Sequence, residues 1–225
     1  MNYIVASWEW LASPVNMSGP NGWVARMVEH LWYTALATVI ACLLGIPLGY
    51  AVGHAHRFRT AIVSSTGAAR ALPTLGVVTL FGLILGIGLE APMLAFVLLA
   101  LPSVLAGAYA GVEGAPRETV DAARAMGLTE WQILIRVEAP LGMPLLLGGI
   151  RSATLQVLAT ATLAAYVGAG GLGRFLFLGL KTQNYPMMLA SSLVVVGMAI
   201  IVDLAFEVVD RLVRRSHPKA VPGTA

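Results

Sequence analysis

The feature that most constrains this chain is a series of long apolar stretches joined by short polar connections. A helix that crosses a bilayer needs about 20 mostly apolar residues. Five stretches meet this length, at about residues 31–53, 61–89, 92–112, 141–167 and 187–209. Only 11% of the residues are charged and 58% are hydrophobic, whereas a soluble domain usually carries about a quarter charged residues. The sequence therefore predicts an all-α polytopic membrane bundle with five spans, and it argues against a soluble enzyme.

The second stretch is the least regular of the five. Arg70, Pro73 and Gly76 fall inside it, and proline removes a backbone hydrogen bond from a helix. Two forms fit this pattern: a single kinked span, or a surface helix followed by a shorter span.

The distribution of Lys and Arg predicts how the bundle is oriented, because cytoplasmic connections carry an excess of basic residues. The connections after the first and third spans, together with the tail, hold nine of them: Arg57, Arg59, Arg117, Arg124, Arg136, Arg211, Arg214, Arg215 and Lys219. The opposite side holds Arg26, Arg174 and Lys181. We therefore expect the N-terminus outside the cell and the C-terminus in the cytoplasm.

This topology divides the chain into three parts. Residues 1–30 form an extracytoplasmic surface segment, residues 31–210 the transmembrane domain, and residues 211–225 a cytoplasmic tail. Residues 1–12 contain no Lys or Arg and place Glu9 between Trp8 and Trp10, which does not fit a secretory signal peptide. They fit an amphipathic piece whose aromatic rings hold it at the membrane surface.

Two arginines fall within the predicted spans, each in the cytoplasmic half. A charge at that depth usually faces the bundle interior or extends toward the interface. Arg70 and Arg151 therefore fit either a packing role or, with Pro73, a role in lining or gating a path. In the last span Glu207 precedes Arg211 by four residues, a spacing typical of a helix that emerges into water.

The polar segment between the third and fourth spans, about residues 113–140, is unlike the rest of the chain. Pro116 suits the first turn of a helix, and Val120, Ala123 and Gly127 follow at helical spacing on one face. Gly127 also suits a left-handed residue that ends the helix. We call this segment the 113–140 loop.

A second helix is predicted directly after Gly127. Thr129 and Gln132 have the spacing of a capping box. We expect an apolar face formed by Trp131, Leu134 and Ile135, and re-entry into the membrane at Pro140. The pattern predicts a helix–turn–helix, which fits either a docking surface with small residues or an amphipathic loop that packs on its own bundle.

The residues of this loop resemble a known motif. In the "EAA" loop of ABC importer permeases, Glu-Ala-Ala is followed after three residues by Gly, then after nine by Ile, one residue and Leu-Pro. Ala122, Ala123, Gly127 and Pro140 match at this spacing, and Asp121 stands in the place of the Glu. Val137 replaces the Ile and Ala139 the Leu. The resemblance implies that Asp121, Ala122, Ala123, Gly127 and Pro140 belong to the helix–loop that docks on the ATPase.

Two further segments extend the resemblance over about residues 31–180. Residues 160–165 with 168–173 look like the end of the fourth span in permeases for glycine betaine, choline and carnitine, and residues 71–75 are similar to the Pro-containing second span. The Gly-rich stretch is shared with amino-acid permeases such as methionine importers, which is the alternative substrate class.

The resemblance also implies the assembly around the chain. Two permease subunits, identical or homologous, would form a path across the bacterial inner membrane and its lipid. Two ABC ATPase copies would bind ATP and Mg²⁺, so no cofactor is expected in this chain, which has no Walker A sequence. An extracytoplasmic binding protein would deliver the solute, and no nucleic-acid partner is expected.

Other patterns carry less weight. Residues 168–173 match G-x-G-x-x-G, but they follow a predicted spanning helix and no strand, so we do not expect a dinucleotide site. His54 and His56 lack a third ligand in the sequence around them, and Cys42 lies in an apolar run. A secondary transporter is the rival from another class, but it would be expected to show paired repeats. An intramembrane enzyme would need a catalytic set, and the sequence offers none.

Overall fold

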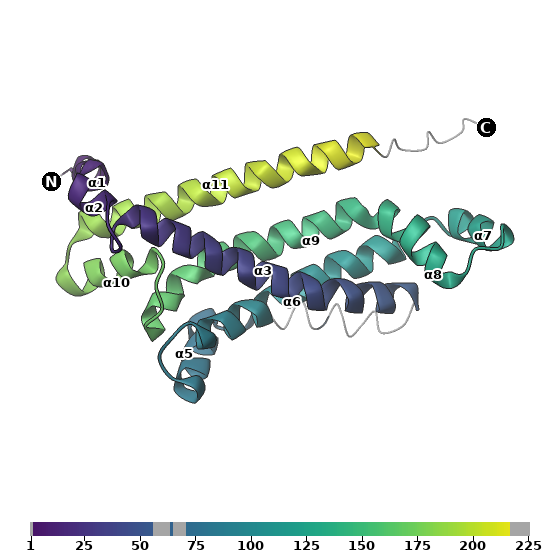
Figure 1. Cartoon of the computed structure of the whole chain (residues 1–225), viewed down its shortest axis with the longest axis horizontal. Helices are drawn as coiled ribbons and strands as arrows, with labels where there is room; N and C mark the ends of the chain where they lie inside the picture. Colours follow the sequence, from purple (N-terminus) through teal and green to yellow (C-terminus); the bar gives the residue numbers. More distant parts are fainter. Residues whose placement is uncertain (1, 56–63, 65–70, 217–225) are drawn as a thin grey trace.

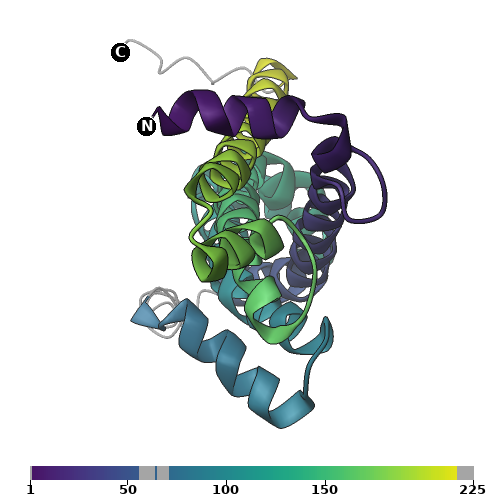
Figure 2. The same cartoon turned by 90° about the vertical axis from the view of Figure 1, so that its left-hand side faces the viewer.

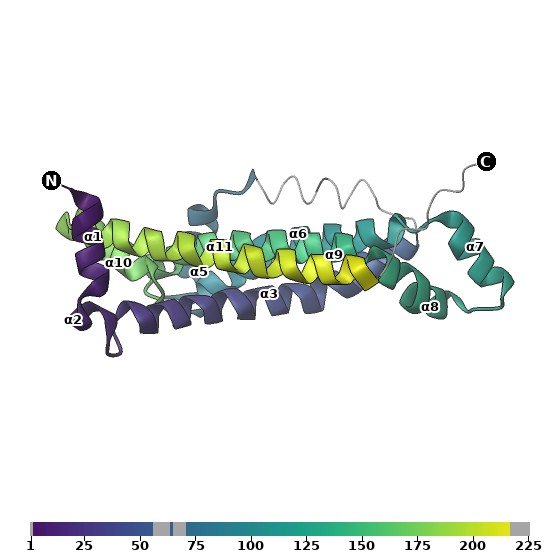
Figure 3. The same cartoon turned by 90° about the horizontal axis from the view of Figure 1, so that it is seen from above.

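The computed structural model describes residues 2–55, 64 and 71–216, and that part of the chain contains helices and no β-strand (Figure 1). Four helical runs among the described residues are long and apolar enough to cross a membrane. They are α3 (Trp23–His54), α6 (Glu90–Glu113), the continuous run Glu130–Val167, and α11 (Tyr185–Ser216). These runs lie lengthwise along the molecule, as predicted for spans one, three, four and five (Figures 1 and 3).

The predicted second span is not confirmed, and neither is the count of five. Its described part is α5 (Thr74–Leu85), 12 residues that begin directly after Pro73 and end at Gly86, where φ is 90°. At about 1.5 Å per residue such a helix is roughly 18 Å long, which is short of the roughly 30 Å of hydrocarbon. The start at Pro73 fits the split form of this span. Arg70 lies outside the described residues.

The described helices on either side of this stretch, α3 and α6, can be placed relative to each other by their contacts. The end of α3 lies beside α8, because His54 contacts Glu130. The start of α6 lies at the opposite end, where the Gly88 N–H donates to the Val167 carbonyl at 3.2 Å. The end of α3 and the start of α6 therefore lie at opposite ends of the bundle.

The fourth run changes its helical type twice. It consists of α8 (Glu130–Ile133), a π-helical turn η1 (Leu134–Glu138), α9 (Ala139–Thr160) and a 3₁₀ segment η2 (Ala161–Val167). We predicted a separate second loop helix with re-entry at Pro140, and the structure instead continues as one helix. Pro140 lies in the first turn of α9 directly after the π-turn, where the regular hydrogen-bond ladder is already interrupted.

The core of the bundle depends on small residues that bring α3, α6 and α9 together. Ala37 and Ala41 of α3 are fully buried, and a Cβ on Gly49 would lie 2.7 Å from the Leu105 carbonyl oxygen of α6. On the other side of α6, a Cβ on Gly107 would lie 2.8 Å from the Cα of Gly149 in α9. Close backbone approach of this kind is how helices associate in lipid.

Short helices cover the two ends of the bundle. One end carries α1 (Tyr3–Ala12), α2 (Pro14–Met17) and α10 (Gly173–Thr182), and the other carries α7 (Arg117–Ala125) and α8. Figure 2 shows α1 lying across the ends of the long helices. Its Ser7 hydroxyl donates to the Pro186 carbonyl, and Trp10 packs edge-on against Phe175 of α10. This arrangement is compatible with the predicted surface segment, although α3 begins at Trp23, before the predicted start of the span.

Candidate functional site

The first helix of the 113–140 loop is built as its sequence predicts. Pro116 is the N-cap of α7, and Glu118 lies in the first turn. At the other end Gly127 has φ 85°, its N–H donates to the Arg124 carbonyl, and the Leu128 N–H donates to the Ala123 carbonyl. This pair of bonds is a Schellman motif, so the predicted left-handed end at Gly127 is confirmed.

Substitution of Gly127 by alanine should therefore lower the stability of this loop. A β-carbon in the left-handed region costs about 1 kcal/mol, and no atom lies within 4 Å of the Cβ position, so the cost is conformational. Gly127→Asn should lose less, because asparagine adopts this conformation more readily. Limited proteolysis of the loop measures the effect, and equal cleavage rates for wild type and Gly127→Ala would contradict it.

The second loop helix has the predicted cap but a different buried face. The Gln132 N–H donates to Thr129 Oγ1 at 3.4 Å, and the Gln132 side chain accepts from the Thr129 N–H at 2.9 Å, which confirms the capping box. The predicted apolar face was only partly right: Leu134 is buried, but Trp131 is 70% exposed and Ile135 is exposed as well. Ile133, which was not predicted, is fully buried. Burial follows Ile133 because this side chain packs against α7.

The face that α7 shares with α8 is a small hydrophobic cluster of Val120, Ala123 and Ile133. Ala123 is 2% exposed, so this predicted docking residue packs inside the loop itself. The neighbouring Ala122 and Met126 are exposed. One face of the loop therefore packs within the chain, and the other lies open at the end of the molecule. The docking prediction concerns this open face.

Ion pairs cross the turn between the two loop helices. Arg124 donates to Asp121 at 3.2 Å, and from Nε and Nη2 to the two Glu130 oxygens at 2.8 and 3.0 Å. The hydrogen bond to Glu130, and then its charge, raise the pKa of the Arg124 guanidinium above its ordinary value. Predicted Asp121 thus lies on the exposed side of α7 and joins a charged cluster.

This cluster continues to the end of α3 through a histidine. His54 Nε2 lies 3.2 Å from Glu130 Oε2, and His54 Nδ1 lies 2.7 Å from Glu138 Oε2. Glu138 belongs to the π-helical turn, and its side chain is only 2% exposed. The contact between His54 and Glu138 was not predicted, because the two residues lie 84 positions apart. Two features of the sequence could have indicated this contact: a histidine at the end of a span, and a glutamate inside the loop motif.

A family model covers most of this architecture. The model described as "Binding-protein-dependent transport system inner membrane component" matches residues 32–215. The chain belongs to this family. It is a multi-pass inner-membrane permease subunit of an ABC importer and not itself an enzyme, and the family implies an ATPase and a binding protein as partners.

Curated relatives in the permease family match along nearly their whole length. The glycine betaine/carnitine/choline transport system permease protein OpuCB of Bacillus subtilis (strain 168) is 29% identical over 195 residues, which are 87% of this chain and 88% of the relative. The osmoprotectant import permease protein OsmW of Salmonella typhimurium is 32% identical over 191 residues, 81% of this chain and 87% of the relative.

Solved structures of permease-containing importers share the fold. A chain of the inward-facing MetNI methionine ABC transporter superposes with a TM-score of 0.72 at 22% identity, covering 85% of this chain and 95% of that one. A chain of an amino acid ABC transporter with histidines gives a TM-score of 0.67 at 16% identity, covering 96% and 99%.

The remaining predicted site residues of the permease lie apart from the 113–140 loop. Arg151 of α9 donates to Asp203 at 2.7 Å and to Glu207 at 3.1 Å, both on α11. It therefore ties α11 to the bundle, as a packing role would require. Its role in a path stays a prediction. Glu207 also accepts from Arg211 at 3.1 Å, as its spacing predicted. Pro73 is the N-cap of α5.

The Gly-rich segment of the permease surrounds a carboxylate of its own chain. The Gly171 N–H donates to Glu29 Oε2 at 2.7 Å, and the Tyr33 hydroxyl donates to Glu29 Oε1 at 2.6 Å. A Cβ on Gly170 would collide with the Glu29 carboxylate. The glycines thus allow a loop to fold over Glu29. Among the described residues no group of three His, Cys, Asp or Glu side chains could hold a metal ion.

Proposed function

We propose that this permease imports a small zwitterionic or cationic compatible solute of the glycine betaine, choline or carnitine class. The curated relatives OpuCB and OsmW support this class, because their names refer to these solutes or to osmoprotectants. The likeness to the methionine importer, at 22% identity, bears on the fold alone. The uptake experiment below must therefore distinguish methionine from the compatible solutes as the substrate.

The proposed assembly has two permease subunits around one path and two ABC ATPase copies that bind ATP and Mg²⁺. The observation that carries this proposal is the 113–140 loop, which extends beyond the long helices at one end of the molecule (Figure 1). On α7 it exposes Ala122 and Ala125, whose small side chains leave room for another protein to approach the helix. The C-cap residue Met126 is exposed beside them. We propose that this exposed face docks on the ATPase.

The end of the bundle that carries α7 and α8 is then the cytoplasmic end. Basic residues gather there, on the loop and at the end of α11: Arg117, Arg124, Arg136 and Arg211. Because cytoplasmic segments are enriched in Lys and Arg, this distribution supports a cytoplasmic C-terminus and an N-terminus on the outer side. The end with α1 and α10 would face the binding protein.

The ion pairs suggest how docking moves the bundle. Glu130 and Glu138 belong to the loop run, and both contact His54 at the end of α3. When closure of the ATPase pair displaces α7, these contacts would carry α3 along with the loop. Because α3 packs along α6 through Gly45, Gly49 and Gly53, its displacement would reach the core.

Substitutions at two neighbouring alanines distinguish an effect on docking from an effect on folding. Ala122→Trp should leave the permease inserted and abundant but lose the ATPase during purification, because Ala122 is exposed and tryptophan tolerates a helix at a cost of about 0.5 kcal/mol. Ala123→Trp should instead reduce abundance, because Ala123 is 2% exposed against Val120 and Ile133. Normal transport by Ala122→Trp with its ATPase attached would rule out this docking face.

Uptake into proteoliposomes tests the function itself. The permease with its ATPase and binding protein should take up glycine betaine, choline or carnitine only when ATP is supplied. Uptake of methionine with none of these solutes would assign the alternative substrate. Uptake driven by an ion gradient without ATP would contradict the proposal and indicate a secondary transporter.

A further inference from the structure

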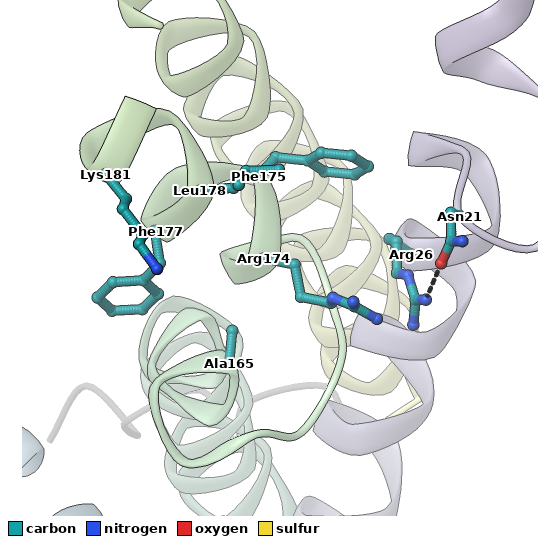
Figure 4. A pocket seen from close by; sticks show the side chains of 8 residues that line it. All are labelled: Asn21, Arg26, Ala165, Arg174, Phe175, Phe177, Leu178 and Lys181. Atoms are coloured by element: carbon teal, nitrogen blue, oxygen red, sulfur yellow. Dashed lines mark hydrogen bonds between the residues drawn. The ribbon is translucent and has the colours of Figure 1, made fainter. Parts of the chain in front are cut away.

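A cavity of about 420 Å³ opens at the end of the bundle that carries α1 and α10. Arg174 and Lys181 of α10 line it together with Arg26 of α3 and Asn21, and Phe177 and Leu178 form part of an apolar wall. Figure 4 shows the guanidinium of Arg174 pointing toward Arg26 and the amine of Lys181 lying by Phe177. The cavity thus combines three cations in one hollow.

The cations of this cavity differ in how they are held. Arg26 donates to Glu29 at 2.7 Å and to Asn21 Oδ1 at 2.7 Å, and its side chain is only 15% exposed. It is therefore fixed in place and already neutralised by one carboxylate. Arg174 and Lys181 are exposed, and no acidic side chain among the described residues pairs with either.

The two cations that have no acidic partner among the described residues, Arg174 and Lys181, create a position that favours an anion. An anion placed there is attracted by both. A guanidinium group binds a carboxylate through two parallel N–H donors, so the interaction is geometrically specific as well as electrostatic. The ligand class that fits this position is a carboxylate, with an aliphatic stem against the Phe177 and Leu178 wall.

We propose that this cavity receives an acidic side chain, Asp or Glu, of the extracytoplasmic binding protein. The inference rests on the proposed function, which puts the α1–α10 end outside. The cavity lies at the end of the molecule opposite to α7 and α8 (Figure 1), where a binding protein must approach. Arg174 and Lys181, which have no acidic partner in the part of the chain that the structure describes, are exposed and accessible to a protein in solution.

The charge of the cavity favours a protein side chain over the solute itself. A betaine-type solute carries a quaternary ammonium only a few atoms from its carboxylate, so both groups would enter the same hollow. Arg174 and Lys181 would repel that ammonium, whereas an Asp or Glu of the binding protein brings negative charge alone.

Charge reversal at the two unpaired cations tests this docking position. The complex of permease and ATPase in lipid nanodiscs is titrated with the labelled, solute-loaded binding protein. We expect Arg174→Glu with Lys181→Glu to weaken docking about tenfold or more, because like charges then face each other. The wild-type affinity should fall steeply with salt, and that dependence should be reduced in the double variant.

The control places one new carboxylate on the same helix but outside the cavity. Thr182→Glu lies on the same helix, is exposed, and does not line the cavity, so it should dock within about twofold of wild type. Retention of the ATPase shows that each variant is folded. Docking of the binding protein to the double variant with wild-type affinity would overturn the proposal. If the double variant instead lost binding of free betaine while docking was unchanged, the cavity would take the solute, and the proposal would also be overturned. Absence of docking in the wild type would contradict the proposed function itself.

Discussion

Replacement of His54 by alanine is expected to lower transport at least about tenfold while the ATPase remains attached. His54 Nδ1 is bonded to Glu138 at 2.7 Å, and the Glu138 side chain is 2% exposed. Removing the imidazole leaves the buried Glu138 carboxylate without this hydrogen-bond partner, which typically costs about 1–3 kcal/mol. The loop would then separate from the end of α3, although the exposed face of α7 would be unchanged.

Two amide variants identify which contact of His54 is needed. In His54→Asn the amide nitrogen takes the place of Nδ1, so the bond to Glu138 can persist while the contact with Glu130 is lost. In His54→Gln the longer side chain favours Glu130. We expect Asn to retain most of the coupling and Gln little of it. Solute transported per ATP hydrolysed is the measurement, and wild-type coupling in His54→Ala would exclude the link from α3 to the loop.

The second large effect concerns the contact between α6 and α9. A Cβ on Gly142 would lie 2.6 Å from the Cα of Gly111, and it would collide with the Gly111 carbonyl group as well. Both partners are backbone, so neither can turn aside as a flexible side chain would. We expect Gly142→Ala to cost about 3 kcal/mol, and to lower membrane abundance and the melting temperature of the purified protein.

The same substitution six positions further along α9 is the control. A Cβ on Gly148 meets no atom within 4 Å, so Gly148→Ala should stay within about 1 kcal/mol of wild type. Equal melting temperatures for the two variants would mean that α6 and α9 do not approach each other as closely as the structure shows. A lower melting temperature for Gly148→Ala alone would indicate that Gly148 contacts another chain.

Features encoded within a few residues could be predicted from the sequence. The left-handed residue Gly127 that follows α7 and the capping box of Thr129 and Gln132 are both local features. Each depends only on residues within one or two helical turns of the chain. The long spans could be predicted for a related reason, since lipid demands an unbroken apolar stretch. The exception is the stretch around Pro73, where α5 has 12 residues and the span count is not confirmed.

Features that depend on residues distant in the chain could not be predicted. Periodicity placed Val120 and Ala123 on one face of α7 but did not reveal that Ile133 covers that face. The bond from His54 to Glu138 joins residues of two helices, and the loop of Gly170 and Gly171 closes on Glu29 across a separation of 142 positions from Gly171. Local patterns specify such elements, but not the partner that each element meets.

Cross-linking from the exposed face of α7 to the ATPase tests the central claim most directly. In a Cys42→Ala background, single cysteines at Ala122 and at Met126 are treated with a short thiol-to-amine reagent in the assembled complex. Both positions are exposed, whereas Ala123 is 2% exposed. We predict ATPase adducts from Ala122→Cys and Met126→Cys and none from Ala123→Cys. Adducts from Thr182→Cys on α10, with none from either α7 position, would contradict the account.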